Sequence, residues 1–178
     1  MRVISGDAGG LPLKTLSGLD TRPTTDKVKG SIFNILYDKI EGADVLDLFS
    51  GSGAMGIEAL SRGAKSATLV DHSQKSAEII RKNLEFTKLS ASVVCRQADK
   101  FLSDCSEKYD IIFMDPPYFS SHITDCMKII AEKNLLNGGG IIVAESDKQE
   151  VFPAEISSFI LRDERFYGRV AVRFYGKK

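Results

Sequence analysis

The chain has 178 residues, and its 43% hydrophobic and 27% charged residues are typical of a soluble globular protein with a full core. Lys and Arg number 24, as do Asp and Glu, so the formal net charge of zero argues against a uniformly basic, nucleic-acid-coating protein. No apolar stretch reaches the roughly 20 residues of a membrane helix, and three cysteines without CxxC spacing and two histidines predict a cytoplasmic protein without disulfides, metal or membrane partner.

The first 42 residues contain two predicted elements. The stretch VISGDAGGLPLKTL alternates apolar residues around glycine and proline, which predicts a short N-terminal hairpin. In RPTTDKVKGSIFNILYDKI, Pro23 precedes a helix that has Thr24 or Thr25 as its N-cap. The buried stripe of this helix is predicted to consist of Val28, Ile32, Ile35, Leu36 and Ile40.

From residue 43 onward, apolar strands alternate with amphipathic helices, which is typical of a parallel sheet with both faces covered. Strands are predicted in DVLDLFS, SATLVDH, ASVVCRQAD, YDIIFMD and GGIIVAES, and helices over residues 53–62, 74–88 (capped by Ser73) and 121–133. A short helix near 148–157 precedes two strands in SFILRDERFYGRVAVRFYG, which form an antiparallel hairpin because no helix separates them. We expect one domain over residues 1–178, with 1–42 as hairpin and helix and 43–178 as the core.

A glycine turn follows the first strand of the core. In LDLFSGSGAMGIEAL, Gly51, Gly53 and Gly56 have GxGxxG spacing at a strand-to-helix junction, where backbone can approach a ligand and the helix offers free N–H groups. Asp71 ends the next strand 20 residues after Gly51, where a carboxylate would meet ribose hydroxyls. Taken alone, these features fit a nicotinamide dinucleotide as well as other nucleotide ligands.

Asp47 favours a different ligand for this turn. It lies in the first strand, four residues before Gly51, where it would repel a pyrophosphate but attract a cation such as the ammonium and sulfonium of S-adenosyl-L-methionine. QAD, at the end of the third strand, places Asp99 within reach of an adenine amino group, whose hydrogen a carboxylate can accept. The candidate donor-binding residues are Asp47, Ser50, Gly51, Gly53, Asp71, His72, Ala98 and Asp99.

The fourth strand ends in MDPPYF, residues 114–119. Pro116 and Pro117 cannot donate a backbone hydrogen bond and fix a rigid, extended exit from the strand. Such an exit presents Asp115 and Tyr118 in a single pose, although a simple strand-terminating turn with a half-buried tyrosine would have the same residues.

Four stretches, VLDLFSGSG, LVDHS, RQAD and MDPPY, resemble in order and spacing the class I S-adenosylmethionine-dependent methyltransferases. DPPY is similar to the [DN]PP[YF] motif of those that methylate exocyclic amino groups of bases. TRPTTDKVKGSIFNIL and RVAVRFYGK resemble the leading segment and the last strand of the bacterial 16S rRNA guanine-N2 methyltransferase family RsmD. The resemblance covers nearly the whole chain, but GDAGG stands where that family tends to have a basic stretch in its first hairpin.

The resemblance implies a Rossmann-like class I methyltransferase fold, with a seven-stranded, mostly parallel sheet. It implies methyl transfer from S-adenosyl-L-methionine to N2 of a guanine in 16S rRNA. The small size, the zero net charge and the scarcity of basic residues in the first hairpin favour folded RNA in an assembling small ribosomal subunit as the substrate, and we expect a monomeric enzyme. Asp115 and the Pro116 carbonyl would accept the hydrogens of the target amine, and Tyr118 would stack on the base. Further candidate substrate contacts are Arg22, Thr24 and Pro117.

Three alternatives fit part of the pattern. DPPY does not choose the base, so an adenine-N6 methyltransferase acting on DNA or RNA shares the same chemistry. A nicotinamide-dependent oxidoreductase fits the glycine turn and Asp71 but gives DPPY no role. A non-catalytic RNA-binding module would need only the basic residues.

These basic residues gather at the two ends of the chain. Residues 1–30 contain five basic and three acidic residues, and residues 162–178 contain six basic and two acidic. The two ends would form one positive face if they lay on the same side of the fold, although solubilising surface charge explains the pattern equally well. The candidate RNA contacts are Arg22, Lys27 and Lys29, together with Arg165, Arg169 and Arg173.

Overall fold

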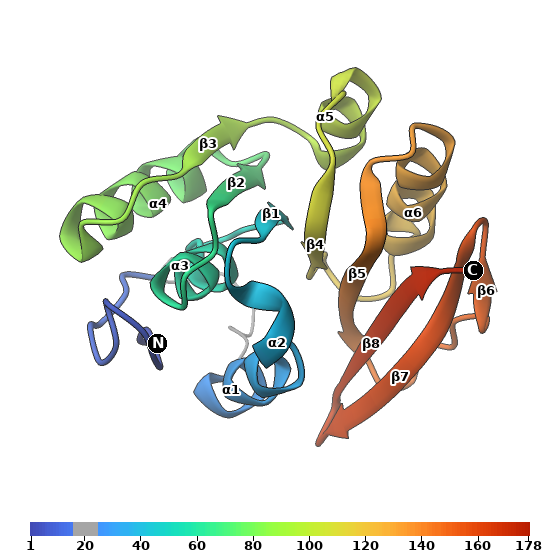
Figure 1. Ribbon diagram of the computed structural model, residues 1–178, viewed down its shortest axis with the longest axis horizontal. Coiled ribbons are helices and arrows are strands. Elements are labelled where there is room, and N and C mark those ends of the chain that lie inside the picture. Colours follow the sequence, from blue (N-terminus) through green and yellow to red (C-terminus); the bar gives the residue numbers. More distant parts are fainter. Residues whose placement is uncertain (16–24) are drawn as a thin grey trace.

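The computed structural model describes residues 1–15 and 25–178, which fold around one eight-stranded sheet (Figure 1). The strand order is β3-β2-β1-β4-β5-β8-β7-β6. Strands β1 to β5 run parallel to their neighbours among themselves, whereas β8, β7 and β6 add antiparallel. The strands are β1 Asp44–Leu48, β2 Ser66–Asp71, β3 Ser92–Cys95, β4 Tyr109–Met114, β5 Leu136–Asp147, β6 Glu155–Ile156, β7 Phe159–Tyr167 and β8 Val170–Lys177.

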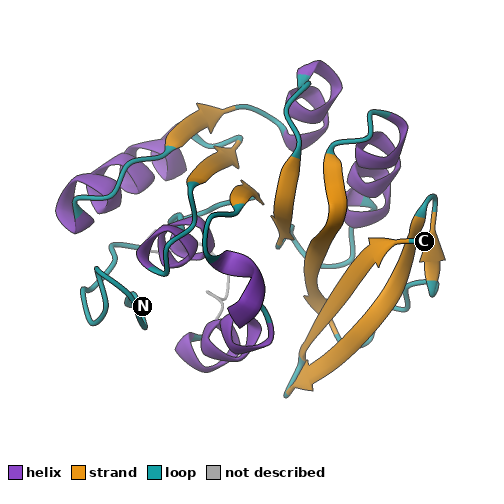
Figure 2. Cartoon of the chain, in the orientation of Figure 1, coloured by secondary structure: helices purple, strands orange, loops and turns teal. Residues whose placement is uncertain are grey.

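Helices cover both faces of this sheet (Figure 2). On one face, Phe33 of α1 packs with Phe113 of β4 at 5.6 Å between ring centroids, in a cluster that includes α3 and α4. On the other face, Met127 of α6 and residues of α5 pack with Ile112 of β4. The expected α/β class, with a Rossmann-like core and a terminal antiparallel hairpin, is confirmed. The helices are α1 Asp26–Ile35, α2 Tyr37–Ile40, α3 Ala54–Ser61, α4 Gln74–Thr87, α5 Ala98–Asp104 and α6 His122–Glu132.

The expected helix near 148–157 is wrong, and the sheet has eight strands where seven were expected. After β5, Glu150 N–H bonds the Asp147 carbonyl in a turn, and Pro153 cannot donate a helical hydrogen bond. The chain then pairs as β6 with β7. Arg173, which no local pattern connects to this segment, donates to the Glu150 carbonyl and lies over the Phe152 ring. A distant side chain therefore fixes this stretch.

The third strand is shorter than predicted because its last residues begin a helix. Strand β3 ends at Cys95, and the Gln97 carbonyl accepts the N–H of Phe101 in the first turn of α5. Ala98 and Asp99 are therefore helical residues that follow the carboxyl end of β3, rather than members of the strand. Their place at that end of the sheet is the one the sequence predicts.

The N-terminal segment is hairpin-like but forms no strand within residues 1–15. Arg2 and Pro12 make an isolated antiparallel bridge, and Val3 donates to the Leu11 carbonyl at 2.9 Å. In the helix that follows, Thr25 is the N-cap and accepts from Val28 N–H, as expected. The predicted stripe is buried except for Ile35, which is 41% exposed. In the described part of the chain, no helix is long and apolar enough to cross a membrane.

Candidate active site

The candidate site lies where the strand order reverses, between β1 and β4. Asp47 is in register with Phe113, and Leu48 with Met114, so the turns that follow these strands leave the sheet side by side. Ligands of open α/β sheets bind at this reversal, outside the carboxyl ends of the strands. The fold therefore brings the glycine turn of residues 50–53 next to the DPPY turn of residues 115–118.

Two glycines of the first turn have different environments. The Gly53 N–H donates to the Ser50 carbonyl at 2.7 Å, and both Gly51 and Gly53 have positive φ, at 55° and 80°. A Cβ on Gly53 would lie 2.9 Å from a methyl of Leu69, whereas a Cβ on Gly51 would meet no heavy atom within 4 Å. Gly53 is thus required by packing, while Gly51 presents an open backbone face to which a ligand has access.

Ser50 and Asp71 hold this turn in place. The Ser50 hydroxyl donates to the Asp47 and Val70 carbonyls, at 2.5 and 3.1 Å. The Asp71 carboxylate accepts the Gly51 N–H at 2.9 Å with one oxygen and the Ser73 N–H at 2.8 Å with the other. Asp71 therefore ties the turn after β1 to the turn after β2, and each of its oxygens keeps a second lone pair for a ligand hydroxyl.

Asp47 has a partner that its spacing in the sequence does not reveal. Its carboxylate is 3% exposed and accepts the N–H of Gly56, in the first turn of α3, at 3.0 Å. Burial, with a further contribution from the negative charge of Asp71, raises the pKa of Asp47 to about 7. Asp47 thus joins α3 to β1, and its charge changes near neutral pH.

The other three predicted donor contacts, His72, Ala98 and Asp99, lie along the same edge. His72 follows Asp71, and its side chain is 72% exposed. Asp99 is exposed in the first turn of α5. Burial, and secondly the charges of Asp99 and Asp125, raise the pKa of the Cys126 thiol to about 12, which places Asp99 beside α6. Glycine turn, Asp71 and Asp99 therefore follow three neighbouring strands, as the sequence predicts.

The DPPY turn is held by a contact to the next strand. Pro116 is buried, Asp115 and Tyr118 are half-buried, and Pro117 is exposed. The Tyr118 hydroxyl donates to the Glu145 carboxylate of β5 at 3.2 Å. Burial, followed by the charges of Glu145 and Asp115, raises the pKa of Tyr118 well above its ordinary value, so its hydroxyl remains a donor.

Two phenylalanines beside these turns adopt backbone conformations that non-glycine residues rarely take. Phe49, before the glycine turn, has φ 64°, and Phe119, after DPPY, has φ 59°. Such conformations cost of order 1–3 kcal/mol each and cluster at functional sites. The Phe49 ring lies 5.6 Å from the His122 ring, whereas Phe119 is 65% exposed and so does not belong to the core.

The predicted RNA contacts divide into three groups. Arg22 and Thr24 lie outside the described residues. Lys29 is fully buried and Arg173 is 4% exposed, so these two predictions are wrong: Lys29 pairs with Glu58, and Arg173 with Glu164. Lys27, Arg165 and Arg169 have exposed positions, as predicted.

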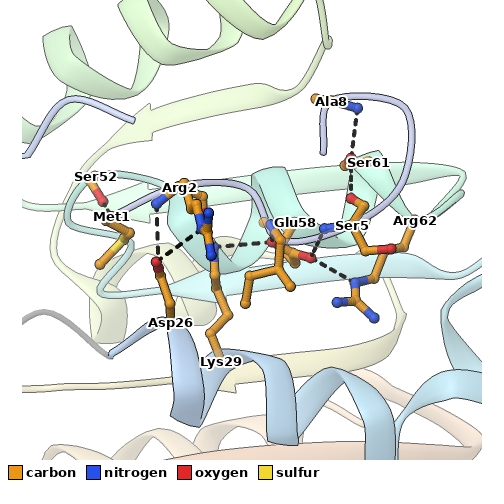
Figure 3. Close-up of polar contacts among 12 residues, drawn as sticks. Met1, Arg2, Ser5, Ala8, Asp26, Lys29, Ser52, Glu58, Ser61 and Arg62 are labelled. Carbon is orange, nitrogen blue, oxygen red and sulfur yellow. Dashed lines mark hydrogen bonds and ion pairs between the residues drawn. The ribbon is translucent and has the colours of Figure 1, made fainter. Parts of the chain in front are cut away.

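Lys29 and Glu58 form a buried ion pair that joins the N-terminal segment to the site (Figure 3). Their charged atoms lie 3.1 Å apart, and both side chains are fully buried. Lys29 also donates to the Arg2 carbonyl at 2.6 Å, and Glu58 accepts from Ser5 N–H and Arg62. Burial lowers the pKa of Lys29, although Glu58 opposes this. The pair anchors α1 and the first residues of the chain to α3, the helix that directly follows the glycine turn.

Glu145 is the site residue that the sequence reasoning missed. It is a carboxylate in the apolar run IIVAES, 5% exposed, and such buried charges are rare without a specific partner. That mismatch between residue type and strand pattern was the available signal. Its contact with Tyr118 could not be read from the sequence, because 27 residues separate the two.

Comparisons with known proteins give consistent results. The family model described as conserved hypothetical protein 95 matches residues 1–176. The "Putative rRNA methyltransferase YlbH" of Bacillus subtilis is 38% identical over 100% of both chains. "Ribosomal RNA small subunit methyltransferase D" of Escherichia coli is 34% identical, over 100% of this chain and 90% of its own. The solved structure "Putative methyltransferase yhhF from Escherichia coli" has a TM-score of 0.90 and 32% identity, covering 100% of this chain and 98% of that one.

Proposed function

The chain belongs to the family described as conserved hypothetical protein 95, the RsmD family, and on this basis we propose that it methylates N2 of a guanine in 16S rRNA with S-adenosyl-L-methionine as donor. The observation that carries the proposal is the DPPY turn beside the glycine turn, at the reversal of strand order. A dinucleotide oxidoreductase would use the glycine turn but leave Asp115 and Tyr118 without a role.

The residues of the first turn fit the proposed donor. The open face of Gly51 admits a ligand, Asp71 offers acceptors to ribose hydroxyls, and the exposed carboxylate of Asp99 suits an adenine amino group. Ala98 and His72 adjoin these residues. When bound, the donor supplies a methyl group on a positively charged sulfur that a nucleophile can displace.

The DPPY turn prepares the nucleophile. The exocyclic amine of guanine is a weak nucleophile because its lone pair is delocalised into the ring. Asp115 and the Pro116 carbonyl accept its two hydrogens and redirect the lone pair toward the methyl carbon. Tyr118 stacks on the base after it leaves its helix. Because the prolines fix the turn, the contribution of these residues is mainly positioning.

Mass analysis of modified nucleosides tests the function. Naked 16S RNA, assembling small-subunit particles and duplex DNA are incubated with the protein and S-adenosyl-L-methionine at one salt concentration. We expect N2-methylguanosine in the RNA, with the particles preferred. N6-methyladenine as the product, in RNA or DNA, would contradict the proposal.

Donor affinity should rise with pH. The Asp47 carboxyl, with its pKa of about 7, is largely neutral at pH 6 and ionised at pH 7.5, and only the ionised form attracts a cation. Calorimetry should therefore show tighter binding of S-adenosyl-L-methionine at pH 7.5 than at pH 6. Asp47→Asn keeps an acceptor for Gly56 N–H and should remove most of this difference.

Ionisation of Asp47 should lower the stability of the protein without donor, whereas it should raise the affinity for the donor. Because the folded pKa of Asp47 lies above the ordinary value near 4, the folded state binds more protons than the unfolded state between pH 4 and about 7. Asp47 therefore reduces stability as pH rises through this window, and Asp47→Asn should stabilise the protein more at pH 8 than at pH 4.

The identity of the donor is tested by calorimetry with NAD and with S-adenosylhomocysteine. Binding of NAD, with no binding of S-adenosylhomocysteine, would contradict the assignment of the donor.

RNA contacts are expected at the turn between β7 and β8 and at Lys148, which follows β5 and donates its backbone N–H to the Arg169 carbonyl at 2.8 Å. We call this surface the hairpin tip and define it as Lys148, Arg165 and Arg169. Val170 pairs with Asp147, so the tip lies at the carboxyl end of β5, on the edge that carries DPPY. Replacing Arg165 and Arg169 by glutamine should raise the KM for RNA without changing donor affinity. Each lost phosphate contact should flatten the logarithmic salt dependence of binding by about 0.7 to 0.9.

The opposite end of the same hairpin supplies a matched control. Lys177 pairs with Phe159 far from the tip, and the Lys178 side chain is 50% exposed. Replacing both by glutamine removes the same charge from the same element, at the other edge of the sheet. If this control weakens RNA binding as much as the tip variant, the effect is one of net charge, and the tip is not a contact surface.

A further inference from the structure

Glu145 stands beside the DPPY turn with its carboxylate held near the reacting groups. Ala144 is in register with Met114, so Glu145 follows Ala144 on β5 as Asp115 follows Met114 on β4. The Tyr118 hydroxyl donates to Glu145 Oε1 at 3.2 Å. Burial and, after it, the negative charges of Glu145, of Asp115 and, least of the three, of Asp147 raise the pKa of this hydroxyl, so the carboxylates of Glu145 and Asp115 both lie near it. A base stacked on the Tyr118 ring would therefore have carboxylates along its edge.

Carboxylates of this kind distinguish guanine from adenine. An ionised carboxylate accepts hydrogen bonds and donates none. Beside its amino group, guanine presents N1–H, a donor, whereas adenine presents N1 as an acceptor. Two carboxylate acceptors fit the N1 and N2 edge of guanine, while adenine would place the lone pair of its N1 against a negative charge. An analogue that has no hydrogen at N1 loses this hydrogen bond, and a site built to make such a bond discriminates against it.

We propose that Glu145 is the residue that selects guanine, accepting N1–H of the base while Asp115 accepts a hydrogen of its N2 amine. This assignment rests on the proposed function. It supplies the choice of base that DPPY does not make. The hydrogen bond from Tyr118 fixes the carboxylate of Glu145 at the hydroxyl end of the stacking ring. A base stacked on this ring would therefore meet Glu145 with its edge.

The probe is RNA in which the target guanine is replaced by 2-aminopurine. This base keeps the 2-amino group but has an unprotonated N1 that accepts. The wild-type protein should methylate guanine about 10- to 100-fold better in kcat/KM, the range expected for one hydrogen bond to a charged group. In Glu145→Gln, the amide keeps an acceptor for Tyr118 and gains a donor for N1. In this variant, the ratio of kcat/KM for guanine to kcat/KM for 2-aminopurine should fall toward one.

Asp147→Asn is the matched control. Asp147 lies two residues further along β5, and its carboxylate accepts from Arg169 and from Gln149 N–H. The same loss of charge there should leave the ratio of the two substrates unchanged. Calorimetry with S-adenosylhomocysteine confirms that each variant is folded.

Two results would overturn the assignment. If Glu145→Gln lowers methylation of both bases by the same factor, Glu145 only positions Tyr118. If the wild-type protein does not discriminate between guanine and 2-aminopurine, no residue accepts a hydrogen bond from N1–H. This result does not depend on whether the Glu145→Gln variant folds. Failure of the proposed function is a separate outcome, since it appears as methylation of adenine N6, or of neither base, by the wild-type protein.

Discussion

Replacing Asp115 by alanine should lower the rate of methyl transfer by about 10²–10³ fold, the usual cost of removing one preorganised polar group from a site of this kind. The variant loses one of two acceptors that orient the target amine. Donor affinity should remain nearly unchanged, because the proposed donor contacts lie in β1 and in the segments that follow β1, β2 and β3. Single-turnover methylation and calorimetry with S-adenosylhomocysteine measure the two quantities separately.

The series of substitutions at this position distinguishes an acceptor from a simple charge. Asp115→Asn keeps one acceptor oxygen and should retain more activity than Asp115→Ala. Asp125→Ala, which removes an exposed carboxylate in the first turn of α6, should have little effect. An alanine variant that methylates at the wild-type rate would show that Asp115 does not orient the amine.

Replacing Lys29 by methionine should destabilise the protein by about 3–5 kcal/mol, the usual cost of removing one partner of a buried ion pair. Glu58 would remain fully buried without its fully buried cationic partner, although it would keep Arg62 and the backbone N–H groups of Ile4 and Ser5. Unfolding in urea measures the loss, provided that the slope with denaturant is unchanged.

An exposed ion pair in the same protein provides the comparison. Lys178 and Glu155 lie 2.7 Å apart with side chains 50% and 64% exposed. Lys178→Met should cost less than about 1 kcal/mol, because water screens such a pair. Equal losses for the two lysine variants would mean that the Lys29–Glu58 pair does not anchor the N-terminal segment.

Elements with complete local signals could be predicted from the sequence. Strands β1, β2 and β4 are apolar runs between clear breakers, and Thr25 and Ser73 cap their helices as expected. The glycine turn and Asp71 were placed correctly because carboxyl ends of neighbouring parallel strands meet at one edge. The catalytic roles of Asp115, Pro116 and Tyr118 stay predictions.

The errors arise where a distant residue decides the outcome. The sequence around Lys29 predicts a surface cation, but in the structure Lys29 forms a buried ion pair with Glu58, 29 positions later. Arg173 likewise reads as a free basic residue, but it is held by Glu164 and by the Glu150 carbonyl, and it orders the segment mistaken for a helix. Neither pairing has a local sequence signature, so charge counts overstated the basic surface.

The position of β8 has a consequence for how the chain is made. This strand follows all the others in sequence, yet it lies inside the sheet, between β5 and β7. While the ribosome synthesises the protein, β5 keeps an unpaired edge until Val170–Lys177 has emerged, and such an edge is a template for aggregation. Because β7 and β8 are joined by a short turn, they can pair first and then dock on β5 as one unit. A nascent chain interrupted before Val170 would therefore leave β5 with an open edge that β8 covers in the complete sheet, and would leave β7 without its long partner strand.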